Sequence, residues 1–199
     1  MKVLSSLSNE LSEILTDYSD FFFSRDLEYL DSRIGINTNT KGAVVREMYN
    51  EATSPEYLWK AMDQIWDYGY PRHSWGLELN HDRAYYSDRE LVAKSKETND
   101  KLMNFFGARH NALQMFYPAG GYIGWHHNGN APGYNIVLSC NPKGKGSFTH
   151  YDHNIDQFYV YEDQPGWNCK VGYFGSLKEE DRLYWHCAKT TTPRITFSY

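Results

Sequence analysis

Apolar residues near the start of the chain recur at helical spacing. Positions three and four apart lie on one face of a helix, and the first fifteen residues place leucine or isoleucine at such positions: Leu4, Leu7, Leu11, Ile14 and Leu15. The pattern predicts one amphipathic helix in this segment.

Two further helices are predicted in the first half of the chain. The second begins at Pro55, because Ser54 is a capping residue and proline is favoured at the first helical position, and it stops at Gly69. The third is introduced by a capping box at 87–90 (Ser-Asp-Arg-Glu) and can end at Gly107.

After Gly107 the period shortens to β-like runs separated by Gly, Pro, Asn and Asp. Eight runs are rich in aromatic or β-branched residues: 112–117, 122–127, 134–140, 146–151, 157–162, 169–174, 183–187 and 194–199. Eight short strands at this spacing favour a sandwich or jelly roll over a parallel sheet with crossover helices. We expect the helices to pack against the outside of one sheet.

The length of 199 residues suits one domain with a sizeable core and is short for two. We therefore predict a single domain, 1–199, with a helix-rich supporting region (1–110) before the β core (111–199). Aromatic residues make up 17% of the chain, as in a β-rich core filled by Tyr, Phe and Trp. Cys140, Cys169 and Cys187 are odd in number and lack paired short spacing, so we expect reduced, packed thiols.

The charge and hydropathy of the chain exclude several partners. A net charge of -5 gives no general attraction to phosphate backbones, so nucleic acid is disfavoured. No apolar stretch approaches the roughly 18 residues that span a bilayer, and Glu10 and Glu13 interrupt the region where a signal peptide is apolar. We expect no membrane partner and a cytoplasmic location, while the sequence says nothing of the oligomeric state.

Candidate chemistry begins on the second predicted strand, where His126 and Asn128 lie two residues apart and share a face. A second imidazole, His186, lies on the seventh strand, and strands distant in sequence can converge on one pocket. Two imidazoles and one oxygen donor on a single face of a metal leave three positions open. Arg194 begins the eighth strand, and its guanidinium suits a carboxylate through two parallel hydrogen bonds.

These residues resemble a known family. From Asn111 to Thr196 the chain is similar to the iron(II)/2-oxoglutarate-dependent dioxygenases, in particular their prolyl-hydroxylase-like and alkylation-repair-like branches. That family carries His-x-Asp/Glu on the second core strand, a second His on the seventh and Arg-x-Ser/Thr on the eighth. His126, His186 and the pair Arg194 and Thr196 match these positions.

The resemblance implies a double-stranded β-helix (jelly roll) of eight core strands that holds Fe(II) and 2-oxoglutarate. It implies His126, Asn128 and His186 as the catalytic metal ligands, and Arg194 with Thr196 as the co-substrate anchor. Tyr117, nine residues before His126, looks like the tyrosine that such enzymes use to bond 2-oxoglutarate. Asn135 and Ser139 share a face of the third strand and are further candidates for this contact.

Asn128 departs from the family pattern because it replaces a carboxylate. Three arrangements are open: the amide oxygen ligates the metal; the position is left to water or a halide, as in halogenases with Gly or Ala there; or the protein does not catalyse. His150-x-Asp152 matches His-x-Asp literally, but the family's fold places four strands between its two ligand strands. Four predicted strands separate Asn128 from His186 and only two separate Asp152 from it, which favours His126. Asp152 and His153 are then expected at a turn or pocket rim, and His127 on the opposite face of its strand.

The expected function is therefore an iron(II)- and 2-oxoglutarate-dependent oxygenase that hydroxylates an unidentified substrate with release of succinate and CO2. A halogenase and a non-catalytic jelly-roll module for a small ligand are the alternatives. Loops near 70–87 and 152–168 are expected to shape the entrance for a small molecule or a protein side chain, because function on such scaffolds lies in loops.

Overall fold

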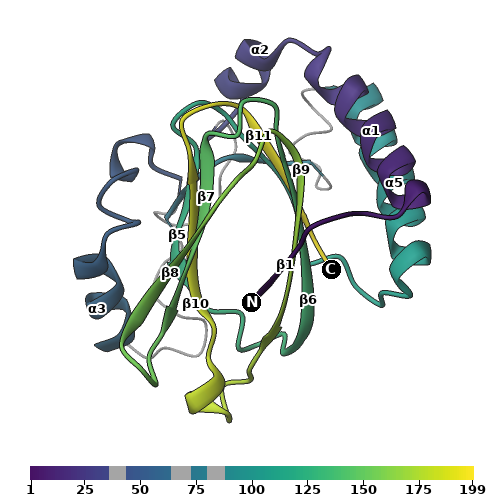
Figure 1. Ribbon diagram of the computed structural model, residues 1–199. Helices are drawn as coiled ribbons and strands as arrows, with labels where there is room; N and C mark the ends of the chain where they lie inside the picture. The colour runs from purple at the N-terminus through teal and green to yellow at the C-terminus, as the bar shows by residue number, and fades with distance from the viewer. Residues whose placement is uncertain (36–43, 64–72, 80–87) are drawn as a thin grey trace.

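The computed structural model describes residues 1–35, 44–63, 73–79 and 88–199. Within these residues two antiparallel sheets face each other and helices cover their outer faces (Figure 1). The fold is thus mainly β with a few helices, as the sequence predicts.

The larger sheet has six strands in the described residues. Its order is β1 (Lys2–Leu4), β9 (Gly166–Phe174), β6 (Gly133–Asn141), β11 (Arg194–Ser198), β4 (Leu113–Tyr117) and β3 (Leu77–Glu78). The smaller sheet, counted over the same part of the chain, has five: β2 (Ser74–Trp75), β5 (Tyr122–His126), β10 (Trp185–Thr190), β7 (Gly146–Asp152) and β8 (Gln157–Glu162). From β4 to β11 the chain changes sheet at every connection except the one between β7 and β8.

Each of the eight predicted strands overlaps an observed one, from β4 to β11. Three strands were not predicted: β1, β2 and β3 are two or three residues long, too short for an alternating pattern to be visible. They come from the first 110 residues, so the sheets do not begin at the predicted boundary between the two regions.

The first predicted helix is α1 (Asn9–Phe23), and it starts later than expected. Ser8 is its N-cap, and the Ser8 hydroxyl accepts a hydrogen bond from the backbone N–H of Leu11. Leu4 therefore lies in β1, outside the helix. A short helix that was not predicted, α2 (Leu27–Ser32), follows with Asp26 as its cap.

The second predicted helix is α3 (Pro55–Asp63), whose N-terminus is capped by the Ser54 hydroxyl. Its predicted continuation to Gly69 lies outside the described residues. The third is α5 (Arg89–Phe106), and it ends at Gly107, which adopts the left-handed conformation with φ 61°. The cap of α5 is Asp88, which accepts from the backbone N–H of Leu91, while Ser87 lies outside the described residues.

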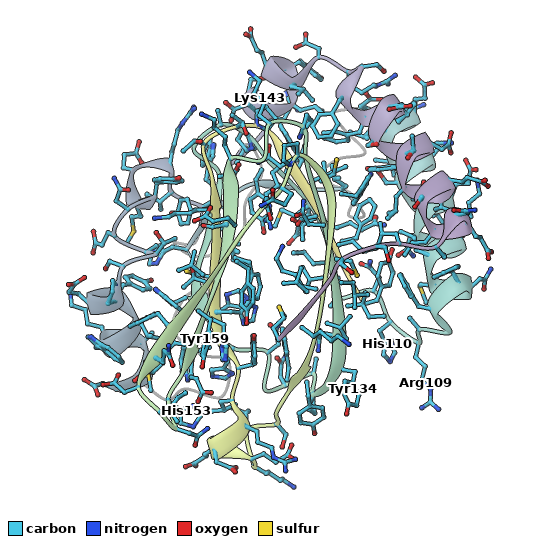
Figure 2. The ribbon with its side chains drawn as sticks, in the orientation of Figure 1. Arg109, His110, Tyr134, Lys143, His153 and Tyr159 are labelled. Atoms are coloured by element: carbon cyan, nitrogen blue, oxygen red, sulfur yellow. The ribbon has the colours of Figure 1, made fainter. Side chains whose placement is uncertain are left out.

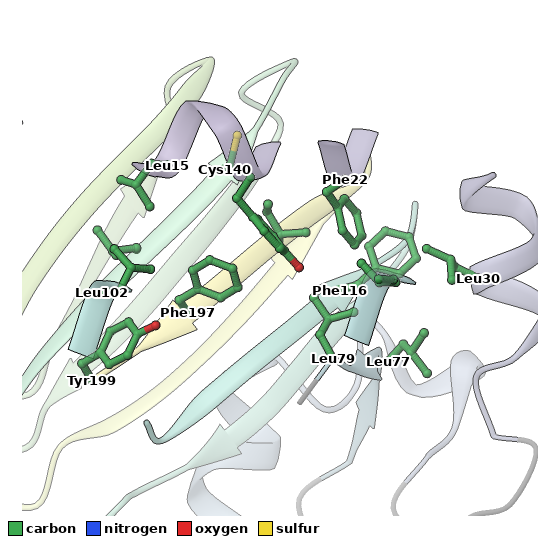
Figure 3. Packing of buried hydrophobic residues seen from close by; sticks show 14 of the residues in the cluster. Leu15, Phe22, Leu30, Leu77, Leu79, Leu102, Phe116, Cys140, Phe197 and Tyr199 are labelled. Atoms are coloured by element: carbon green, nitrogen blue, oxygen red, sulfur yellow. The ribbon is translucent and has the colours of Figure 1, made fainter. Parts of the chain in front are cut away.

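The helices cover both sheets, so the prediction that they pack on one sheet is wrong. Helices α1 and α5 lie along the larger sheet, and α3 lies against the smaller one (Figure 1). In Figure 3 Leu15, Phe22 and Leu102 of the helices pack with Phe116 and Phe197 of the larger sheet. Each such side chain contributes about 1.5–3 kcal/mol when fully buried. Helix α3 instead buries Tyr57, Leu58 and Ala61 against Tyr122, Trp125 and Trp185.

A further apolar cluster fills part of the space between the sheets. It joins inward-facing residues of both sheets: Met115, Tyr117, Ile123, Phe148, Phe174, Tyr184 and Ala188. Two 3-10 turns, η1 (Arg46–Met48) and η2 (Glu180–Arg182), lie outside the sheets. The three cysteines are buried and unbridged, as predicted, and burial raises the pKa of Cys140 and Cys187 to about 12. None of the helices in the described ranges is both long and apolar enough to cross a bilayer.

Candidate active site

A cavity of about 540 Å³ lies between the two sheets. Of the eight residues that the sequence singles out for the site, Ser139 does not line the cavity and seven do: Tyr117, His126, Asn128, Asn135, His186, Arg194 and Thr196. They come from β4, β5, β6, β10, β11 and the segment after β5. The cavity therefore brings together residues that lie almost eighty positions apart in the chain.

His126 and His186 face each other across neighbouring strands of the smaller sheet. They are paired in register between β5 and β10, and their ring centroids are 4.1 Å apart. The register shifts just beyond this pair, between His186 and Ala188, as at a β-bulge. Both rings are buried and both line the same cavity.

Both imidazoles are held in the same way. Nδ1 of His126 lies 2.8 Å from the carbonyl oxygen of Gly124, and Nδ1 of His186 lies 2.7 Å from that of Tyr184. A carbonyl oxygen only accepts, so Nδ1 is the donor in each ring, and in the neutral imidazole the lone pair is then on Nε2. This is the arrangement that orients metal-binding histidines in proteins.

Asn128 lies beyond the end of β5, which stops at His126. The chain turns here, and the carbonyl oxygen of Asn128 accepts from the N–H of Ala131 at 2.8 Å. The prediction that Asn128 belongs to the strand is therefore wrong, because pairing with β10 ends at the His126–His186 register position. Asn128 nevertheless lines the cavity together with both histidines. No group of three or more His, Cys, Asp or Glu side chains is placed to hold a metal in the described part of the chain.

Arg194 lies toward the other end of the cavity, in a cluster that the sequence did not predict. Its Nε donates to Oδ2 of Asp163 at 2.7 Å, and Lys170 Nζ lies 3.2 Å from Oδ1 of the same carboxylate. The Ser139 hydroxyl donates to Oδ1 at 3.3 Å, so Ser139 contacts Asp163. All three charged side chains are at most 1% exposed.

The charges in this cluster perturb one another. Burial alone would raise the pKa of the Asp163 carboxyl, but Arg194 and Lys170 outweigh burial, and the pKa is lowered. Burial lowers the pKa of Lys170, and attraction to Asp163 opposes that shift only in part. Asp163 is therefore ionised at neutral pH. One carboxylate faces two basic side chains, so the cluster carries net positive charge whenever Lys170 is protonated.

Two buried polar atoms near this cluster lack a partner. Nη2 of Arg194 and Oγ1 of Thr196 have no hydrogen bond, and both residues line the cavity. Leaving such groups unpaired costs about 1–3 kcal/mol each, more for a charge. The ring of Tyr117 lies 6.0 Å from the Arg194 guanidinium carbon. A carboxylate at this end of the cavity would meet both unpaired donors.

Gly146 makes the ion pair of Asp163 and Arg194 possible. A β-carbon at position 146 would lie 2.5 Å from Oδ2 of Asp163 and 3.2 Å from Cδ of Arg194. The carbonyl oxygen of Gly146 also accepts the backbone N–H of Asp163 at 2.8 Å. This glycine is required by close approach of a side chain, and not by an unusual φ angle.

The cavity reaches solvent between the end of α5 and the start of β6. Exposed lining residues mark this rim: Arg109, His110, Asn130 and Tyr134, of which Tyr134 is 79% exposed. Figure 2 places Arg109, His110 and Tyr134 at the end of the molecule away from Lys143. The expectation that 152–168 forms the entrance is wrong for the described residues, because no residue of that range lines the cavity. Residues 70–72 and 80–87 lie outside the description.

The literal His-x-Asp motif has other roles. His150 is paired in register with His186, but it does not line the cavity, and its ring stacks on Tyr184 with centroids 3.7 Å apart. Oδ1 of Asp152 accepts from the N–H of Asn154, a turn contact as predicted. His127 packs edge-on against Trp185 and is also absent from the cavity lining.

No protein-family model matches the chain, and no curated protein matches it. Solved structures that are similar include the dioxygenase for auxin oxidation of rice, at 13% identity and a TM-score of 0.41 over 97% of this chain and 69% of that chain. The viral collagen prolyl hydroxylase of Paramecium bursaria Chlorella virus-1, in a 2-oxoglutarate complex, is similar at 10% identity and a TM-score of 0.34. The match covers 64% of this chain and 77% of that chain.

The dioxygenase for auxin oxidation 1 of Arabidopsis thaliana, in binary complex with 2-oxoglutarate, is similar at 13% identity and a TM-score of 0.31. The match covers 95% of this chain and 76% of that chain. These superpositions are too loose, and the identities too low, to assign an activity.

Proposed function

We propose that the chain is an iron(II)- and 2-oxoglutarate-dependent oxygenase that hydroxylates its substrate and releases succinate and CO2. One observation carries the proposal: a pair of oriented imidazoles and an unpartnered buried guanidinium nitrogen line the same cavity. The imidazoles suit a metal and the guanidinium suits a carboxylate. 2-Oxoglutarate can bind a metal through its keto-acid end and a guanidinium through its distal carboxylate.

The strand order supports a double-stranded β-helix as the scaffold. The central strands pair as β9-β6-β11-β4 in one sheet and as β5-β10-β7-β8 in the other. Such an order arises when a long hairpin is rolled up so that its successive strands fall alternately in two sheets. The roll leaves inward-facing residues of β5, β10 and β11 on one interior.

The donor set fits a divalent metal that prefers nitrogen and oxygen ligands. His126 and His186 would hold it through Nε2, because Nδ1 of each ring is engaged by a backbone carbonyl. Asn128 would supply an amide oxygen from the same cavity wall. Two imidazoles and one oxygen donor from the protein would leave room for a chelating co-substrate.

The deep end of the cavity fits the distal carboxylate of 2-oxoglutarate. Nη2 of Arg194 and Oγ1 of Thr196 would donate to it, and Asp163 holds the guanidinium in place through Nε. Tyr117 and Asn135 line the same space and offer further polar groups. The described lining contains no Asp or Glu side chain that would repel a dianion.

When bound, iron(II) and 2-oxoglutarate supply the oxidation: oxygen is consumed, 2-oxoglutarate loses CO2 to give succinate, and a substrate C–H bond gains a hydroxyl group. The chain's own residues orient these partners. The apolar walls formed by Ile123, Phe148, Phe174 and Ala188 keep water from the space beside the histidines. A small molecule or a protein side chain would enter at the rim that includes His110 and Tyr134.

A manganese(II) titration tests the proposal without iron oxidation. We expect manganese to raise the melting temperature and 2-oxoglutarate to raise it further, because both ligands bind the folded state. His186→Ala should abolish both effects, and Arg194→Met should abolish only the second. His150→Gln is the matched control, since this buried histidine does not line the cavity. Wild-type protein that shows no shift with either ligand would leave a non-catalytic binding module as the better assignment.

Asn128 favours one second candidate, a halogenase of the same cofactor class. Because Asn128 offers a weak amide donor in place of a carboxylate, chloride could replace it as a ligand of a metal held by His126 and His186. Turnover that requires chloride and incorporates it into product would support this candidate. Succinate formation that is indifferent to chloride, and that improves in Asn128→Asp, would support the hydroxylase.

A further inference from the structure

The third metal-ligand position is followed by a glycine. Asn128-Gly129 is the only Asn-Gly pair in the 199 residues. In such a pair the backbone nitrogen of glycine attacks the asparagine side chain with little hindrance, because glycine has no β-carbon. Among the asparagines of the sequence, Asn128 is therefore the one whose side chain is least hindered from this attack by the residue that follows it.

The structure adds a proton acceptor to this pair. The backbone N–H of Gly129 donates to Nδ1 of His127 at 3.1 Å. The His127 ring is buried and is held edge-on against Trp185, with centroids 4.7 Å apart. Nδ1 of His127 accepts this bond, so its lone pair already points at the proton that the Gly129 nitrogen must lose.

Gly129 lies close to neighbouring side chains. A β-carbon there would lie 2.9 Å from Cδ2 of Leu183 and 3.1 Å from Nδ1 of His127. The turn is closed by the bond from Ala131 to the Asn128 carbonyl oxygen. The reactive pair thus lies in a shaped turn at the cavity wall.

We propose that Asn128 is a self-modification site at which its amide becomes a carboxylate, an inference that rests on the proposed metal site. The Gly129 nitrogen attacks Cγ of Asn128 and gives its proton to His127. The new N–Cγ bond closes a cyclic imide, the Cγ–Nδ2 bond breaks, and Nδ2 leaves as ammonia with the transferred proton. Water then opens the imide at the backbone carbonyl–nitrogen or side-chain carbonyl–nitrogen bond, and the latter opening gives aspartate.

The product supplies what the cavity lacks. The described lining holds Arg109, Arg194 and three histidines but no Asp or Glu. An aspartate at 128 would complete two imidazoles and one carboxylate, the set that suits iron(II) with open positions. The modification would convert a weak metal site into a strong one after folding.

Peptide mass spectrometry tests the reaction independently of any activity. Purified protein is incubated in native buffer, and the peptide that contains 127–131 is followed over time. We expect Asn128 to gain the mass of an amide-to-acid exchange, with aspartate exceeding isoaspartate in electron-transfer fragmentation. Asn130, exposed two residues away and followed by alanine, is the internal control and should keep its amide.

Variants separate directed chemistry from ordinary degradation. His127→Gln keeps a hydrogen-bond acceptor but no basic nitrogen, and it should slow conversion several-fold while near-ultraviolet circular dichroism stays native. Asn128→Gln should not convert. The proposal is overturned if Asn128 keeps its amide in the folded protein, if isoaspartate dominates, or if His127→Gln converts as fast as the wild type.

Manganese binding links the modification to the metal site. Converted wild type and freshly purified Asn128→Asp should bind manganese alike, about ten-fold or more tightly than unconverted wild type. If the amide persists while binding still depends on His126 and His186, the modification fails and the oxygenase proposal stands. If Asn128→Asp binds no manganese, both fail.

Discussion

Arg194 donates through Nε to Oδ2 of Asp163 at 2.7 Å, and Nη2 of the same guanidinium has no partner in the protein. One nitrogen is used to fix the side chain and another is left toward the cavity. The ion pair is buried, so water does not compete for the bond between Arg194 and Asp163. Such an arrangement prepares the guanidinium for a ligand before any ligand arrives.

Asp163→Asn should destabilise the protein strongly. The substitution leaves Arg194 and Lys170 without a counter-charge, and breaking a buried ion pair typically costs about 3–5 kcal/mol. Urea unfolding monitored by fluorescence measures the change. Ser139→Ala is the matched control, because it removes only a 3.3 Å bond to the same carboxylate, and it should cost about 1 kcal/mol. Similar losses in the two variants would contradict the role given to Asp163.

Gly146→Ala should weaken 2-oxoglutarate binding. The added methyl would lie 2.5 Å from Oδ2 of Asp163, so the carboxylate must move and Arg194 loses its fixed position. Overpacking of this kind costs about 1–3 kcal/mol of stability. Calorimetric titration with 2-oxoglutarate in the presence of manganese measures the affinity.

The control for that experiment is Gly172→Ala. Gly172 lies in β9 of the larger sheet, and its β-carbon would meet nothing closer than Met1 Cε at 3.4 Å, an ordinary contact. It should bind 2-oxoglutarate like the wild type. If Gly146→Ala and Gly172→Ala bind 2-oxoglutarate with equal affinity, Gly146 is not needed to position Arg194 for this ligand.

The residues that the sequence could identify are those on regular strands. His186 and Arg194 are found by counting strands and alternation, and both lie on the predicted strands with their side chains lining the cavity. Asn128 is found by its spacing from His126, although the strand has already ended. Local patterns therefore suffice where a side chain's direction follows from the strand itself.

Asp163 and Lys170 escape such reasoning. Asp163 follows β8 in one sheet, Lys170 lies in β9 of the other, and Arg194 joins them only in three dimensions. The available hint was a lysine between apolar neighbours, Cys169 and Val171, in a predicted strand. The sheet against which α3 packs could not be predicted for a related reason. The apolar face of α3 shows that the helix packs on something, but not against which sheet.

Thr196→Val should stabilise the ligand-free protein slightly and weaken dicarboxylate binding. The Thr196 hydroxyl is buried without a partner, and a methyl of similar size removes the cost of that unpaired group, about 1 kcal/mol or more. The same change removes a donor from the proposed carboxylate site. Melting temperatures with and without 2-oxoglutarate measure both effects in one experiment.

Thr190→Val provides the opposite case. The Thr190 hydroxyl bonds with Asn141 Nδ2 at 3.0 Å and with the Thr192 carbonyl oxygen at 2.6 Å, so its loss leaves buried groups unpaired. We expect destabilisation of about 1–3 kcal/mol. If Thr196→Val destabilises the ligand-free protein as much as Thr190→Val does, the Thr196 hydroxyl makes a hydrogen bond in the folded protein and the prediction is wrong.

Acid should destabilise the protein through His150. Burial lowers the pKa of this imidazole to about 4, an effect that the proximity of the Met1 amine and His153 reinforces and that the Trp185 carbonyl and Asp152 oppose. The unfolded chain binds the proton below pH 6.5 and the folded chain only near pH 4. The stabilisation is therefore complete above pH 6.5 and is lost as the pH falls toward 4.

The size of the loss is up to about 3 kcal/mol, since each pKa unit corresponds to about 1.4 kcal/mol. Urea unfolding at a series of pH values between 7 and 4 measures it, and His150→Gln is the comparison. The variant loses the stacking of His150 on Tyr184, so it should start less stable at neutral pH but decline less steeply. Its free energy of unfolding and that of the wild type should therefore converge as acid is added. Parallel curves would mean that His150 binds its proton at the same pH in the folded and unfolded chains, and that the acid sensitivity of the fold arises at other groups.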